Sequence, residues 1–226
     1  MGKENKMNKK QPALIKRYHY IEEWGDNTLR KCDRVIRQLR RLLRHYSMGL
    51  IPSPNYTVDE LKGLCISLLE SQRDDVENLY GMKPYSWCIT PDAKGMPGDA
   101  RVYYAFTPTY LAVSILTKFL VDYPEIAKEI PNYETQLKRG MVFASYRKLQ
   151  GHGYEGEHSL YDTIRLFKMA KVADFLAENP DFCPELLETL REVKAFFANS
   201  RYESRGYAEP LNKVQVADIL RVLGRV

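Results

Sequence analysis

The sequence has no long apolar run and little cysteine. Its longest near-continuous apolar stretch, residues 110–116, is far shorter than the roughly 18 residues that cross a bilayer, so we expect no membrane span. The four cysteines lie far apart and form no Cys-x-x-Cys pair, which argues against a zinc site and a disulfide framework. Residues 1–17 lack the apolar segment of a secretory signal. We therefore expect a cytoplasmic protein with no metal and no cofactor.

No segment keeps a clean alternation of apolar and polar residues, so nothing predicts a sheet. The 226 residues are 44% hydrophobic and 28% charged, which is typical of a globular protein. The net charge of +5 is uneven, because residues 1–50 hold 13 Lys and Arg against 5 Asp and Glu. The expected fold class is all-α, with a flexible basic tail over residues 1–27 and a single domain over residues 28–226.

The first predicted helix, residues 28–50, has two opposite faces. Its apolar seam is formed by Cys32, Ile36, Leu39, Leu43 and Tyr46. An arginine stripe lies opposite this seam and consists of Arg30, Arg34, Arg37, Arg41 and Arg44. Such a stripe fits a solvated face, an acidic partner, a membrane surface or nucleic acid. Nucleic acid is disfavoured because no helix-turn-helix pattern follows.

Further helix signals organise residues 57–226. Thr57 and Glu60 form a capping box, and Thr107 with Pro108 predicts a helix start that ends a long loop over residues 81–106. That loop is interpreted either as a lid over a ligand site or as a structural plug. Amphipathic helices are expected over residues 133–149 and 184–198, and more fully apolar helices over residues 159–177 and 212–223.

The chain also repeats itself. Residues 119–125, Phe-Leu-Val-Asp-Tyr-Pro-Glu, match residues 175–181, Phe-Leu-Ala-Glu-Asn-Pro-Asp, at an offset of 56. An amphipathic helix, a Gly-Tyr pair and a more apolar helix follow each copy, and the two Gly-Tyr pairs lie 53 residues apart. This period is typical of helical-hairpin repeats.

This cycle consists of an outer helix over residues 136–150, the loop Gly-His-Gly-Tyr-Glu-Gly over 151–156 and an inner helix over 159–177. It resembles the α/α-toroid superfamily. That superfamily includes terpenoid cyclases, protein prenyltransferase β-subunits, polysaccharide lyases and glycosidases. The resemblance implies a partial α/α toroid, an open arc whose concave side binds a ligand and which a second copy could close as a homodimer. The acidic motif of the cyclases and the zinc ligands of the prenyltransferases are missing, so no catalytic role is carried over.

Two groups of residues are candidates for chemistry. The acid–base candidates are His152, Glu155, Glu157, His158 and Asp162, since a histidine and a carboxylate at a cavity mouth can exchange protons. The ligand-binding candidates combine aromatic faces with polar groups and are Trp87, Asp99, Arg101, Tyr103, Tyr104, Tyr110, Tyr154, Tyr161, Arg165 and Tyr207. A solvated polar loop and ordinary helix packing remain the alternatives for these groups.

We therefore hold two hypotheses of function. In the first, a tyrosine-rich concave pocket binds a small or linear ligand, such as a carbohydrate or an isoprenoid-like molecule, with or without a reaction. In the second, the chain is a non-catalytic helical-repeat module that binds a protein partner. No motif decides whether the protein is an enzyme.

Overall fold

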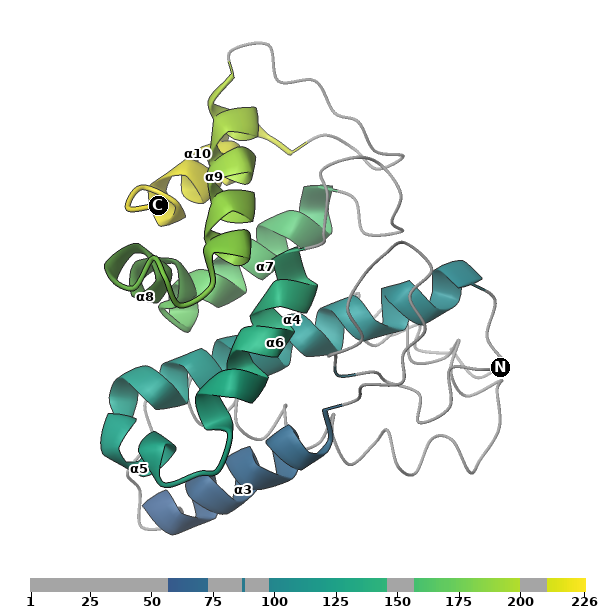
Figure 1. The fold of residues 1–226 in the computed structure, drawn as a ribbon. Helices are drawn as coiled ribbons and strands as arrows, with labels where there is room; N and C mark the ends of the chain where they lie inside the picture. The colour runs from purple at the N-terminus through teal and green to yellow at the C-terminus, as the bar shows by residue number, and fades with distance from the viewer. Residues whose placement is uncertain (1–56, 73–86, 88–97, 146–156, 200–210) are drawn as a thin grey trace, which may run out of the picture.

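The computed structural model describes residues 57–72, 87, 98–145, 157–199 and 211–226 (Figure 1). These residues contain helices and no strand, which confirms the all-α fold class for this part of the chain. No helix among them is long and apolar enough to span a membrane. The helices are α3 (Val58–Glu70), α4 (Gly98–Asp122), α5 (Pro124–Lys128), α6 (Tyr133–Ser145), α7 (Glu157–Met169), α8 (Val172–Glu178), α9 (Pro184–Ala198) and α10 (Lys213–Val222). The tail and the first predicted helix lie outside the described residues.

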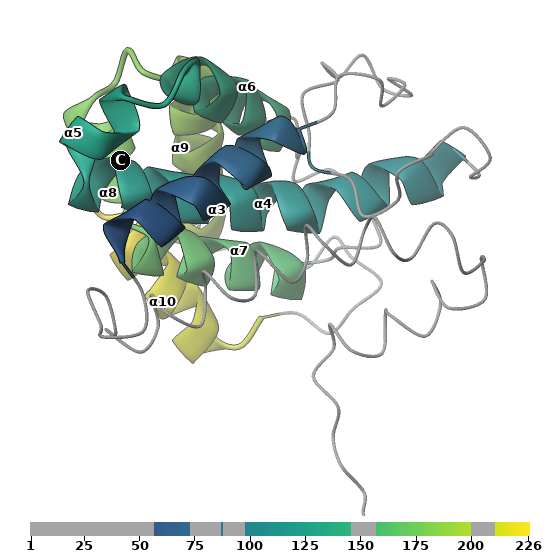
Figure 2. The same cartoon turned by 90° about the horizontal axis from the view of Figure 1, so that it is seen from below.

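Helix α4 is the centre of the fold. It packs against α5, α6, α7 and α8, while α9 packs against α6, α8 and α10 (Figures 1 and 2). Its buried face includes Val113, Leu116 and Phe119. The predicted start at Thr107 is wrong, because α4 begins at Gly98 and runs through Pro108. Pro108 therefore lies inside a helix, where it cannot donate a backbone hydrogen bond, and the residues directly after it, from Thr109 onward, are largely buried.

Several helix boundaries follow directly from the sequence. At the start of α3 the Thr57 hydroxyl accepts from the Glu60 amide at 3.2 Å, and the Thr57 amide donates to the Glu60 carboxylate at 2.9 Å. This confirms the predicted capping box. Helix α9 spans the predicted residues 184–198, with Leu187, Leu190, Val193 and Phe197 buried.

The segment expected to be one helix over residues 159–177 is two helices. Between α7 and α8, Lys171 has φ 58° and ψ 25°, in the left-handed region that residues with a side chain seldom adopt. Its ammonium lies 4.0 Å from the carboxylate of Asp122 at the end of α4. The prediction of a continuous helix is therefore wrong.

The pattern of burial explains this break. The buried apolar side chains of the two helices include Leu160, Ile164 and Phe167 in α7, and Val172, Ala173 and Leu176 in α8. At about 100° per residue, one uninterrupted helix would hold these two groups on roughly opposite sides. The break rotates α8 so that both groups reach one core. The sequence therefore shows apolar residues all around residues 159–177 because two amphipathic helices follow each other there. It does not reflect one helix that is buried on several sides.

Charged contacts hold α8 and α9 to the last residues described. Arg225 lies 2.9 Å from Glu178 and 3.6 Å from Asp174, both on α8. The Lys194 ammonium of α9 donates to the carbonyls of Gly224 and Val226, at 3.2 and 2.9 Å. Since Leu223, directly before Gly224, is fully buried, these last residues pack on the core.

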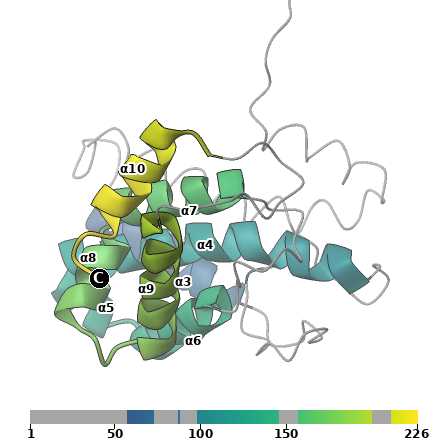
Figure 3. The same cartoon turned by 90° about the horizontal axis from the view of Figure 1, so that it is seen from above.

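Helices α4, α7 and α10 all begin toward the same side of the molecule (Figures 1–3). Helix α6 runs obliquely back toward that side after α4, whereas α9 runs across the direction of α4 and α7 (Figures 1 and 3). Residues 56 positions apart in the two copies of the repeat are also both buried. The pairs are Leu116/Val172, Leu120/Leu176, Ala127/Cys183, Ile130/Leu186, Leu137/Val193 and Met141/Phe197.

Candidate functional site

Trp87, expected to contact a ligand from the long loop, lies in the core. Its side chain is fully buried, its indole N–H donates to the Leu68 carbonyl at 2.8 Å, and its backbone N–H donates to the Thr109 hydroxyl at 3.0 Å. The ring rests on Gly140 of α6. Because α3, α4 and α6 enclose this side chain, it supports the plug interpretation of the loop at this residue.

Tyr110 is also a core residue. It is 3% exposed, and its ring meets the ring of Phe167 on α7 edge to face, with centroids 6.0 Å apart. This geometry is typical of aromatic packing between helices. Two of the ten ligand-binding candidates therefore join helices of the core in this structure.

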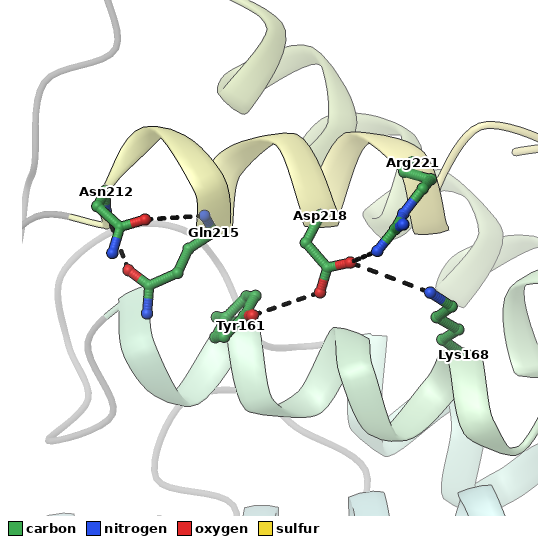
Figure 4. A network of polar contacts seen from close by, with 6 residues as sticks. All are labelled: Tyr161, Lys168, Asn212, Gln215, Asp218 and Arg221. Atoms are coloured by element: carbon green, nitrogen blue, oxygen red, sulfur yellow. Dashed lines mark hydrogen bonds and ion pairs between the residues drawn. The ribbon is translucent and has the colours of Figure 1, made fainter.

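Tyr161, Asp162 and Arg165 all lie on α7, and the structure brings two of them together. The Arg165 guanidinium lies over the Tyr161 ring, 5.5 Å from its centroid, in a cation–π contact. Asp162 is exposed on a different face of the helix. Tyr161 is half-buried, and its hydroxyl lies 3.3 Å from the Asp218 carboxylate of α10 (Figure 4).

For the other candidates the structure gives at most a position in a helix. Glu157 and His158 are the first two residues of α7, and Asp99, Arg101, Tyr103 and Tyr104 belong to the first two turns of α4; their side chains lie outside the described part. The remaining candidates, His152, Tyr154, Glu155 and Tyr207, lie outside the described residues. The described residues hold no cluster of three His, Cys, Asp or Glu side chains that could bind a metal ion.

Asp218 is the centre of a polar network that sequence reasoning missed. Its carboxylate pairs with Arg221 one turn later on α10, accepts from the Tyr161 hydroxyl, and lies 4.0 Å from the Lys168 ammonium of α7 (Figure 4). The pKa of Asp218 is lowered by the hydrogen bond from Arg221, by the charges of Arg221 and Lys168, and by the Tyr161 hydroxyl. Its partial burial acts in the opposite direction. The spacing of Tyr161, Arg165 and Lys168, four and then three, could have revealed this face of α7.

We expect this network to make stability depend on acid pH. Because the pKa of Asp218 is lower in the folded than in the unfolded protein, its contribution is present above pH 4 and lost as the pH falls through the folded pKa. The contribution is below about 1 kcal/mol, since Arg221 is largely exposed. Urea unfolding at pH 7 and pH 3 should show a smaller acid loss for Asp218→Asn than for the parent. Equal losses would contradict the assignment.

Two described cysteines are unsuited to nucleophilic chemistry. Cys65 and Cys183 are fully buried, and burial is the main cause that raises the pKa of each thiol to about 12. A thiol with so high a pKa stays protonated at neutral pH, whereas the thiolate is the nucleophile. Both residues thus act as small apolar core residues, as the sequence predicted for most of the cysteines.

Among the described residues, α7 and α10 bring together polar and aromatic side chains, those of Tyr161, Arg165, Lys168, Asp218 and Arg221. Of the acid–base candidates, Asp162 alone has a described side chain. Comparison with family models, with curated proteins and with solved structures finds no match to this chain.

Proposed function

We propose that the chain is a helical-hairpin repeat protein, a partial α/α toroid, that binds a small or linear ligand at the side where α4, α7 and α10 begin. The common direction of these three helices carries the proposal (Figures 1–3). Tyr103 and Tyr104 lie near the start of α4, Tyr154 precedes α7, and Tyr207 precedes α10. Because these three helices begin on the same side, we expect these tyrosines to lie near one another there.

The repeat interpretation is supported by burial at matched positions and by the order in which the helices pack. The chain passes from α4 to α6, then through α7 and α8 to α9, and α6 packs against α9 while α7 packs against both α4 and α10. This is the packing expected when each hairpin lies beside the previous one. We assign binding to the protein and no reaction.

The ligand class that suits tyrosine faces is a carbohydrate or an isoprenoid-like molecule. Amide NMR spectra of the full chain titrated with cellotriose and, separately, with geraniol test this. We expect shifts that cluster in the first turns of α4, α7 and α10. Tyr161→Ala should weaken binding roughly tenfold, whereas Tyr123→Ala, a matched half-buried tyrosine at the far end of α4, should not. Shifts scattered over the molecule, or none with either probe, would refute the proposal.

A second candidate is a non-catalytic module that binds a protein partner. Burial of Trp87 and Tyr110 favours it, because both are removed from the aromatic set that a ligand could contact. The arginine stripe lies outside the described residues and is tested by the double change Arg34→Glu with Arg41→Glu. Loss of a co-purifying protein, together with silent cellotriose and geraniol titrations, would favour this candidate over the first.

A further inference from the structure

The solvent side of the seam between α7 and α10 carries an excess of positive charge. Arg165 and Lys168 lie on one flank of α7, since Tyr161, Arg165 and Lys168 are spaced four and three residues apart. Arg221 of α10 and Lys168 of α7 both reach the carboxylate of Asp218 (Figure 4). Arg165 lies over the ring of Tyr161, whose hydroxyl contacts the same carboxylate.

The exposure of these groups leaves the cations accessible and the carboxylate shielded. The side chains of Arg221 and Lys168 are 70% and 49% exposed, whereas that of Asp218 is 16% exposed. Asp218 is thus positioned as a counter-ion for Arg221 and Lys168. It compensates only one of these two positive charges.

The contacts of the cations leave them able to bind an anion. Lys168 lies 4.0 Å from Asp218, at the outer limit of an ion pair, and its ammonium has three donors. The Arg165 guanidinium lies 5.5 Å from the centroid of the Tyr161 ring, and a cation–π contact of this kind does not use the N–H donors that point outward in the guanidinium plane. Guanidinium groups match the geometry of carboxylates and phosphates.

We propose that Arg165, Lys168 and Arg221 form a binding site for an oxyanion, the phosphate or carboxylate group of a small ligand. Tyr161 lies near the start of the seam, whereas Lys168 and Arg221 lie in the last turns of α7 and α10 (Figure 4). A linear ligand would therefore extend along the seam, from the side where these helices begin to the anion site at its other end. This proposal adds an anionic group to the ligand of the proposed function. It rests on the proposed function in one respect, that the same ligand binds here. Asp218 competes with the anion for Arg221 and sets the affinity of the site.

Inorganic phosphate is the first probe and citrate the second, each titrated into the full chain at pH 7 with the ionic strength held constant by sodium chloride. Amide NMR spectra should show saturable shifts within residues 161–168 and 218–221. Binding of phosphate alone would identify a phosphate site, and binding of citrate alone a carboxylate site; either supports the proposal. Shifts that sodium chloride reproduces at equal ionic strength would overturn it.

Charge variants give the decisive readout. Arg221→Ala and Lys168→Ala should each weaken anion binding at least about fivefold. Lys128→Ala, which removes an exposed lysine paired with Glu125 on α5, should leave it unchanged. Asp218→Asn should strengthen binding several-fold, because Arg221 loses its competing carboxylate. An unchanged or weaker affinity in folded Asp218→Asn, or equal losses in the two lysine variants, would overturn the site.

Tyr161→Phe separates this charge effect from a loosening of α10. It removes the hydroxyl contact to Asp218 and changes no charge, so anion affinity should stay within about twofold of the parent. A strengthening equal to that of Asp218→Asn would assign the effect to loosening and refute the competition. Anion binding without any response to cellotriose and geraniol would retain the anion site and reject the proposed function, and the reverse result would reject the anion site alone.

Discussion

Replacing Gly140 with alanine should destabilise the protein, although alanine is the better helix former. A β-carbon at this position would lie 2.5 Å from Cζ3 and 3.1 Å from Cη2 of Trp87, and 3.3 Å from a methyl of Val113. The indole is rigid and fully buried, its N–H donates to Leu68 and the Trp87 backbone amide donates to Thr109, so the ring cannot turn aside. Overpacking of about 3 kcal/mol, offset by about 1 kcal/mol of helix propensity, leaves a net loss of about 2 kcal/mol in the free energy of unfolding.

Gly63 provides the matched control for this change. It is an exposed glycine inside α3, and a β-carbon there would meet nothing within 4 Å. Gly63→Ala should therefore stabilise the protein by roughly 0.5–1 kcal/mol. Urea unfolding followed by far-UV circular dichroism measures both variants. Two stabilised variants would show that Trp87 does not rest on α6 as described.

Removing the indole should have the largest effect of any single change. We expect Trp87→Ala to cost about 3–5 kcal/mol, because it opens a cavity between α3, α4 and α6. The lost hydrogen bond to Leu68 contributes little, since the same carbonyl also accepts from the amide and hydroxyl of Ser71, at 3.1 and 2.6 Å. Packing, and not this hydrogen bond, therefore dominates the expected loss.

The backbone anchor of Trp87 can be tested separately. Thr109→Val removes the hydroxyl that accepts from the Trp87 amide and should cost about 1–3 kcal/mol, because a buried donor loses its partner. Thr109→Ser keeps the hydroxyl and should lose less. The same urea unfolding measures these variants, and similar losses in the two would argue against the anchor. A cost below 1 kcal/mol for Trp87→Ala would contradict the enclosed position of the indole.

The amphipathic parts of the fold were predictable from the sequence because their signals are local. The capping box at Thr57 depends on residues three apart, and α9 has one apolar face between Pro184 and a polar end. The start of α4 was not predictable in this way. Proline is favoured at the first position of a helix, so the local signal points to Pro108, although α4 begins at Gly98 and continues through it.

The candidate site was predictable only in part, since it depends on contacts between distant segments. Periodicity placed Tyr161 and Arg165 on one helix, but no pattern near Trp87 indicates that Gly140, 53 residues later, leaves space for its ring. Asp218 was missed for the same reason, because its partners Tyr161 and Lys168 belong to α7. An aromatic residue in a Pro- and Gly-rich loop thus fits both a lid and a core plug.

The left-handed residue between α7 and α8 also divides the backbone into two cooperative units. Hydrogen bonding within a helix is cooperative, so an opening that starts at one end spreads along a continuous ladder but stops where the ladder is interrupted. At the matched positions 114 and 115, α4 has no interruption. Amide hydrogen exchange should therefore be shared along α4 but differ between α7 and α8, which makes the shorter helix able to open while its longer neighbour stays closed.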